Sequence, residues 1–143
     1  MYKRILVALE NSRSDRALLS HMANLAPLHG SELLLVHVAD GFAARNYDTM
    51  KLAESQEMKD DRAYLETEAE ELRARGLPVS TRLALGDPVN GILRTAAEEN
   101  CDLIAMTTHG HRLLGDILYG STINEVRHKA DVPVLLIRAH KEL

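Results

Sequence analysis

The sequence predicts an α/β domain with an open, mostly parallel sheet of five strands and helices on both faces. Two observations lead to this prediction. Short apolar runs of the kind found in strands buried on both faces recur along the chain. Stretches with helical periodicity separate these runs, which is the pattern of repeated βαβ units. The predicted strands are 4–9, 31–40, 78–85, 102–107 and 132–137.

The segments between the strands predict four helices. In the first, Leu18, Met22 and Leu25 recur on one side, and the helix is expected to end around Pro27 and Gly30. The later helices are expected at about 50–75, 88–96 and 121–129.

Two of these helices have a sequence signal for their first residue. Asp87 is suited to cap the third helix, with Pro88 in its first position. The fourth is expected to begin near Ser121, where Thr122 and Glu125 have the spacing of a capping box.

Length and composition narrow the function classes. The 143 residues fit one domain, predicted to span residues 1–143. The net charge of -4 argues against a general nucleic-acid partner. No apolar run approaches the roughly 18 residues that span a bilayer, so no membrane partner is predicted. The single cysteine, Cys101, excludes an intramolecular disulfide and suits the cytoplasm.

A glycine-rich segment follows the fourth predicted strand. In open parallel sheets, ligands bind beyond the carboxyl ends of the strands, at the point where the strand order reverses. Gly110 and Gly120 let a phosphate approach the backbone, and Ser121 adds a hydroxyl donor at the expected helix start. His111 and Arg112 add donors at the mouth of this candidate anion site.

Each of these signals also has a purely structural interpretation. The capping box accounts for the Thr122 hydroxyl without any ligand. Glu10, which ends the first strand, is suited to accept hydrogen bonds from ribose hydroxyls. Taken alone, it is better explained as a solvated loop acid or as a partner for Arg13 or Arg16. Val38, near the end of the second strand, offers contacts to an adenine edge or is a core valine.

Signals for catalysis and metal binding are weak. The seven histidines lack the H-E-x-x-H spacing, so no metal site is predicted. Cys101 has no flanking base and no G-x-S-x-G segment occurs, so no catalytic residue is assigned. A receiver-type enzyme would need an acidic pair after the first strand, where the chain has only Glu10 and Asn11.

Taken together, these segments resemble the universal stress protein family over essentially the full length. The family motif is Gly, two residues, Gly, nine residues, then Gly followed by Ser or Thr. Here Thr107 begins the motif, Gly110 follows, and Gly120-Ser121 ends it. The segments "ILVALENS", "LLLVHV", "GDP", "DLIAMTTHG" and "VPVLLIR" match in order.

This resemblance implies a Rossmann-like sheet in the order 3-2-1-4-5, similar to the adenine nucleotide alpha hydrolases. It implies ATP, or AMP or ADP, as ligand, with Mg²⁺ as a possible companion, and a homodimer through Val132–Ile137. The residues implied for the adenosine are Ala8, Leu9, Glu10 and Val38. Those implied for the floor and the phosphates are Met106, Thr107, Gly110, Gly120, Ser121 and Thr122.

Two positions depart from the family pattern. Thr107 replaces the first glycine, and Glu10 stands where aspartate is usual. The leading hypothesis is a nucleotide-binding protein that acts in the stress response through ligand- and dimer-dependent interactions with unknown protein partners. The alternative is a dimeric interaction module of the same fold that does not bind ATP. Slow ATP hydrolysis, or autophosphorylation on Ser121 or Thr122, stays open under the first hypothesis.

Overall fold

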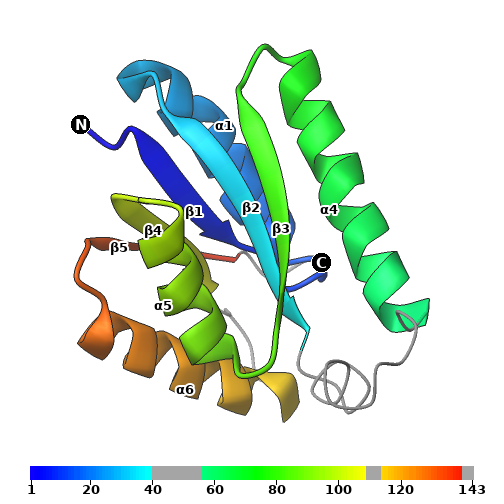
Figure 1. Ribbon diagram of the computed structural model, residues 1–143, viewed down its shortest axis with the longest axis vertical. Coiled ribbons are helices and arrows are strands. Elements are labelled where there is room, and N and C mark those ends of the chain that lie inside the picture. Colours follow the sequence, from blue (N-terminus) through cyan, green and yellow to red (C-terminus); the bar gives the residue numbers. More distant parts are fainter. Residues whose placement is uncertain (40–55, 109–113, 140–143) are drawn as a thin grey trace.

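A computed structural model describes residues 1–39, 56–108 and 114–139, with side chains for all of these except 114–120. Five strands form one sheet in the order β3-β2-β1-β4-β5, and each neighbouring pair is parallel (Figure 1). The predicted fold class and strand order are therefore confirmed. Among the described residues, no helix is long and apolar enough to cross a membrane.

The strands agree with the predicted runs to within two residues at each end. This agreement reflects the strong signal of continuous apolar segments. The bounds are β1 Arg4–Ala8, β2 Glu32–Ala39, β3 Val79–Leu85, β4 Leu103–Thr108 and β5 Val134–Arg138.

Two helix ends follow the sequence signals closely. Asp87 caps the third helix by accepting a hydrogen bond of 2.9 Å from the Asn90 N–H, and Pro88 follows it. Gly30 ends the first helix in a left-handed conformation with φ 64°, which glycine adopts without strain. The helices are α1 Asp15–His29, α4 Gln56–Ala74, α5 Pro88–Glu98 and α6 Leu114–Lys129.

The predicted start of α6 near Ser121 is wrong. The helix begins at Leu114, so Thr122 and Glu125 lie well inside it and do not form a capping box. The apolar residues Leu114, Ile117 and Leu118 continue the helical spacing upstream of Gly120. A single interior glycine costs a helix only about 1 kcal/mol relative to alanine, so the helix runs through it.

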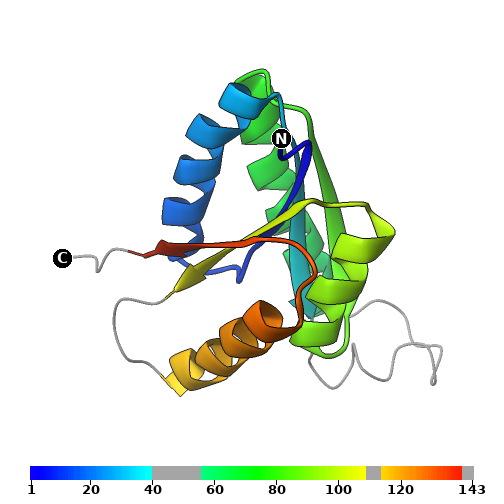
Figure 2. The ribbon, with the colours of Figure 1, turned by 90° about the vertical axis from the view of Figure 1, so that its left-hand side faces the viewer.

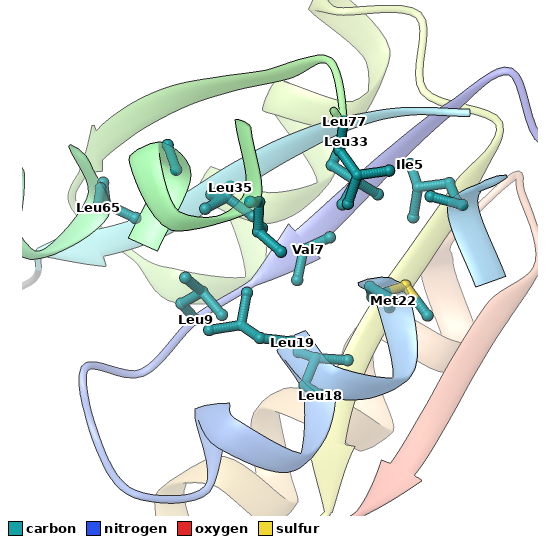
Figure 3. Close-up of a cluster of buried hydrophobic side chains, with 14 of the residues drawn as sticks. Ile5, Val7, Leu9, Leu18, Leu19, Met22, Leu33, Leu35, Leu65 and Leu77 are labelled. Carbon is teal, nitrogen blue, oxygen red and sulfur yellow. The ribbon is translucent and has the colours of Figure 1, made fainter. Parts of the chain in front are cut away.

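The sheet separates two apolar cores. Helices α1 and α4 cover one face, and α5 and α6 cover the other (Figure 2). Because side chains alternate along a strand, Ile5 and Val7 enter the first core while Leu6 and Ala8 enter the second. Figure 3 shows the first core, between the sheet, α1 and α4.

Candidate functional site

Six of the predicted binding residues lie at the carboxyl edge of the sheet. They belong to the ends of β1, β2 and β4, which are neighbours in the order β2-β1-β4. The six are Ala8, Leu9, Glu10, Val38, Met106 and Thr107. Predictions for Gly110, His111 and Arg112 fall outside the described residues.

These six residues divide between the two faces of the sheet. Ala8 and Met106 pack in the second core, which also holds Ile123 of α6. Leu9 points into the first core beside Leu18 and Leu19 of α1 (Figure 3). A ligand at this edge would therefore contact backbone groups at the ends of β1 and β4, and side chains from both faces of the sheet.

Glu10 is held by hydrogen bonds from residues at the start of α1. Its Oε2 accepts hydrogen bonds from the Ser14 hydroxyl at 2.7 Å and the Ser12 hydroxyl at 3.2 Å. The alternative pairing with Arg16 does not occur, since no salt bridge between described residues includes that arginine. A ribose diol would have to replace the two serine hydroxyls as donors to this carboxylate.

A buried carboxylate fixes the loop that presents Glu10. Asp15 is 1% exposed and accepts backbone hydrogen bonds from Glu10 at 2.9 Å, Asn11 at 2.8 Å and Ser12 at 3.3 Å. Asn11 has φ 60°, a left-handed conformation that asparagine tolerates better than most residues. The conformation lets three successive N–H groups converge on one side chain.

Helix α4 contacts the same carboxylate. The Tyr64 hydroxyl donates to Asp15 Oδ2 at 2.6 Å. Burial raises the pKa of Asp15, against the opposing effect of its hydrogen bonds from Tyr64 and the loop backbone. Burial, followed by the hydrogen bond to Asp15, raises the pKa of Tyr64, so its hydroxyl stays protonated and remains a donor.

A second buried carboxylate, that of Asp61 on α4, contacts both the loop after β1 and strand β2. Asp61 Oδ1 accepts a hydrogen bond of 3.0 Å from the Asn11 side chain, and its Oδ2 lies 3.5 Å from His37 Nε2. His37 Nδ1 lies 2.8 Å from the Leu9 carbonyl oxygen. Because a carbonyl only accepts, Nδ1 carries the hydrogen in this bond. The end of β1 is thus connected to Asp61 of α4 through two side chains, Asn11 from the β1–α1 loop and His37 from β2.

Val38 is positioned by a close approach of α5. A Cβ built on Gly91 would lie 3.0 Å from both Val38 methyl carbons, closer than well-packed side chains allow. Glycine at this position lets α5 contact the end of β2. Val38 is half-buried and packs against the second core, so its structural interpretation as a core residue holds for its side chain.

Thr107 has an unusual environment for a polar side chain. It is 2% exposed, and its Oγ1 has no hydrogen-bond partner among the described residues. Thr95, on the buried face of α5, is 0% exposed and shares this property. An unpaired buried hydroxyl costs about 1–3 kcal/mol, so the two threonines form a matched pair for testing.

Gly120, Ser121 and Thr122 lie in α6, which packs on the same face of the sheet as Ala8 and Met106. Their backbone N–H groups come after the first four residues of the helix, so helix carbonyls accept their hydrogen bonds. The expectation that these amides point freely at a phosphate is therefore wrong for this conformation. Ser121 is exposed, and its hydroxyl can still contribute to a site.

Metal and thiol chemistry gain no support from the described part of the chain. No group of three or more His, Cys, Asp or Glu residues there is arranged to hold a metal ion. Cys101 is buried in the second core, and burial raises the pKa of its thiol.

Sequence reasoning missed Asp15, Tyr64, His37 and Asp61. Two signals were available: a lone histidine inside the apolar run of 33–39, and an acidic residue in the first turn of α1. Neither signal identifies its partner, because Tyr64 lies 49 residues from Asp15 in the sequence and Asp61 lies 50 from Asn11.

Comparison with known proteins agrees with this fold. The model of the universal stress protein family matches residues 1–138. A universal stress protein of Thermus aquaticus is 32% identical, over 96% of this chain and 100% of its own. One of Methanocaldococcus jannaschii is 26% identical, over 96% of both chains.

Solved structures show the same architecture. The structure of that Methanocaldococcus protein is 28% identical, with a TM-score of 0.77 and 99% of both chains covered. A universal stress protein from Archaeoglobus fulgidus, solved in complex with dAMP, has a TM-score of 0.71 at 22% identity, over 95% of this chain and 98% of its own. A further universal stress protein, solved in complex with cAMP, has a TM-score of 0.71 at 18% identity, over 97% of this chain and 98% of its own.

Proposed function

Because this chain belongs to the universal stress protein family, we propose that it binds an adenine nucleotide at the carboxyl edge of the sheet, between the ends of β1 and β4. ATP is the proposed ligand, with AMP or ADP as alternatives and Mg²⁺ as a possible companion. The nucleotide would regulate interactions of the protein in a stress response.

The single observation that supports this proposal most is the position of the edge residues. The strand order reverses between β1 and β4, and parallel sheets bind ligands at such switch points. Ala8 ends β1, with Leu9 and Glu10 directly after it, and Met106 and Thr107 lie in the last three residues of β4. In the proposed complex, adenosine lies over these residues and Val38, and the phosphates extend toward Gly110, His111, Arg112 and the 120–122 segment of α6.

Relatives support the ligand class. Two distant members of the fold were solved with dAMP and with cAMP, both of which contain adenine. At 22% and 18% identity, these likenesses show the fold, and the ligands are properties of those proteins. We therefore expect the ligand of this chain to contain adenine, and the number of its phosphates is determined by the titrations below.

The proposed assembly is a homodimer through Val132–Ile137. Strand β5 lies at the edge of the sheet, and its residues Val134 to Ile137 are apolar and half-buried. An exposed apolar edge strand invites pairing with a second copy. The cytoplasm is the proposed location, in keeping with a lone, buried cysteine.

The alternative of a dimeric module without ATP has specific support. Thr107 is a buried threonine at the first glycine position, and the amides at 120–122 are engaged within α6. Under this alternative the carboxyl edge is a packed surface and the dimer alone provides the interaction.

Native mass spectrometry of the purified protein, with calorimetric titration of ATP, ADP and AMP in the presence and absence of Mg²⁺, tests both proposals. We expect a nucleotide-bound dimer, and Gly120→Val should weaken binding by at least about tenfold, or 1.4 kcal/mol. The matched control is Asn124→Val, an exposed β-branched substitution one turn later in α6. A dimer that neither retains nor binds any of the three nucleotides would support the alternative.

A further inference from the structure

A cavity of about 540 Å³ opens between α1 and α4. It lies on the face opposite Ala8, Val38 and Met106, which pack in the second core, and none of the six edge residues lines it. Its volume is in the range of about 300–1,000 Å³ that is typical of small-molecule sites. We call this cavity the α1/α4 groove.

Charges of opposite sign line the two walls of the groove. Arg13 and Arg16 come from the β1–α1 loop and the first turn of α1, whereas Glu68 and Glu71 come from α4. Between the walls lie the largely buried aliphatic side chains of Leu19 and Leu72. Arg75, directly after α4, adds one cation beside these glutamates. The groove therefore combines a cationic wall, a wall with two carboxylates and one guanidinium group, and apolar surface.

Four charged side chains of this groove form no salt bridge with a described residue, in contrast to three arginines elsewhere in the molecule. Arg4, Arg73 and Arg82 each form salt bridges with two glutamates. No salt bridge between described residues includes Arg16, Glu68, Glu71 or Arg75 of the groove.

Glu68 lies in an environment that disfavours its negative charge. Burial, followed by the nearby carboxylates of Glu71 and Asp15, raises its pKa, and Arg16 opposes this only in part. A ligand cation beside Glu68 would relieve the repulsion between these carboxylates. Likewise, an anion beside Arg16 would gain a partner that the fold does not supply.

We propose that the α1/α4 groove binds a small zwitterion, with its anionic group toward Arg13 and Arg16 and its ammonium group toward Glu68 and Glu71. The aliphatic part of the ligand lies over Leu19 and Leu72. A molecule with a single charge can interact favourably with only one of the two walls, so preference for a ligand with both charges is the signature of this site.

This site is separate from the proposed nucleotide site but borders the same loop. Asn11 and Ser12 line the groove, and the backbone N–H groups of both bond to Asp15, which also accepts the hydrogen bond from Glu10. The zwitterion proposal does not depend on nucleotide binding, and the two fail or succeed in separate titrations.

The experiment uses linear ω-amino acids as probes of known charge separation. The full chain is titrated with glycine, 4-aminobutyrate and 6-aminohexanoate, and with hexanoate and hexylammonium as controls of a single charge. Binding is followed by ¹⁵N–¹H NMR and calorimetry. We expect one of the longer amino acids to bind at least about tenfold more tightly than either control, with shifts confined to α1, α4 and the 10–14 loop.

Two variants test the assigned walls. Glu68→Gln removes one charge at nearly constant size, and Arg16→Gln removes one charge and leaves a shorter polar side chain. Each should weaken the best probe by at least about fivefold while leaving the thermal midpoint near that of the parent. Arg82→Gln and Glu70→Gln are matched controls, because their charges are paired outside the groove. Equal binding of hexanoate, hexylammonium and the amino acids would overturn the proposal. So would unchanged binding in Arg16→Gln and Glu68→Gln, or no binding of any probe at about 10 mM.

Discussion

The carboxyl edge of the sheet is held differently on its two faces. On the α1/α4 face, buried Asp15 and Asp61 accept hydrogen bonds from the β1–α1 loop and from α4. On the α5/α6 face, the described residues at this edge make apolar contacts, among them the close approach of Gly91 to Val38.

The two faces determine different properties of the edge: one fixes the orientation of the loop that carries Glu10, and the other fixes the space beside Val38. Directional hydrogen bonds fix the loop that carries Glu10, because three N–H groups and one hydroxyl converge on Asp15. Apolar packing instead determines how much room is left beside Val38, since it depends on volume. Substitutions that change polarity should therefore act on the first face, and those that change volume on the second.

Asp15→Ala should have the largest effect. It leaves three backbone N–H groups and the Tyr64 hydroxyl without an acceptor, so we expect the free energy of unfolding to fall by about 3–5 kcal/mol. Urea denaturation measures this loss, with Asp131→Ala as the exposed control. A loss below about 1 kcal/mol would mean that the loop is held by other contacts.

Gly91→Ala tests the volume-limited face. The added methyl would meet both Val38 methyl carbons at 3.0 Å, and we expect a loss of about 2 kcal/mol by thermal unfolding. Val38→Ala in the same chain should recover part of that loss, because it removes the opposing methyls. Asn90→Ala is the adjacent exposed control. Strict additivity of Gly91→Ala and Val38→Ala would contradict the contact.

Tyr64→Phe removes one of the four donors to Asp15, and we expect a loss of about 1–2 kcal/mol. Comparison with Tyr2→Phe controls for removal of a phenol hydroxyl. In the Asp15→Ala background the same change should have almost no effect, since the acceptor is already absent. An undiminished loss in that background would place the contribution of Tyr64 in packing.

Thr107→Val and Thr95→Val should have the smallest effect and the opposite sign. Each replaces an unpartnered buried hydroxyl by a methyl group, and we expect stabilisation of up to about 1 kcal/mol. Only Thr107→Val should alter nucleotide affinity, because Thr95 lies on α5. Identical nucleotide binding by the parent and both variants would show that the Thr107 hydroxyl has no role in the site.

Much of the architecture could be predicted from local sequence. Apolar runs located four of the strands, and alternation in a segment rich in β-forming residues located β3. Asp87 with Pro88 located the start of α5. The start of α6 was missed because Gly120-Ser121 imitates a helix boundary, whereas the helix tolerates the glycine in its interior. A local signal that has two interpretations cannot decide between a cap and an interior turn.

The site was predicted less completely than the fold. The pattern of alternating strands and helices directs attention to the loops after β1, β2 and β4, and the family resemblance names the residues at this edge. The hydrogen bonds that orient them could not, because Asp61 and Tyr64 reach the β1 loop from a distant helix. Such pairings depend on how α4 is rotated about its axis and how it is shifted along the sheet. Apolar periodicity identifies only which side of the helix faces the core.

The buried position of Cys101 has a practical consequence. Its thiol packs in the second core with a raised pKa, so alkylating reagents meet it only when that core opens. The chain has no other cysteine, and a single mass increment therefore counts the molecules that have opened. The rate of this labelling therefore reports how often the core between the sheet and helices α5 and α6 opens, without an engineered probe.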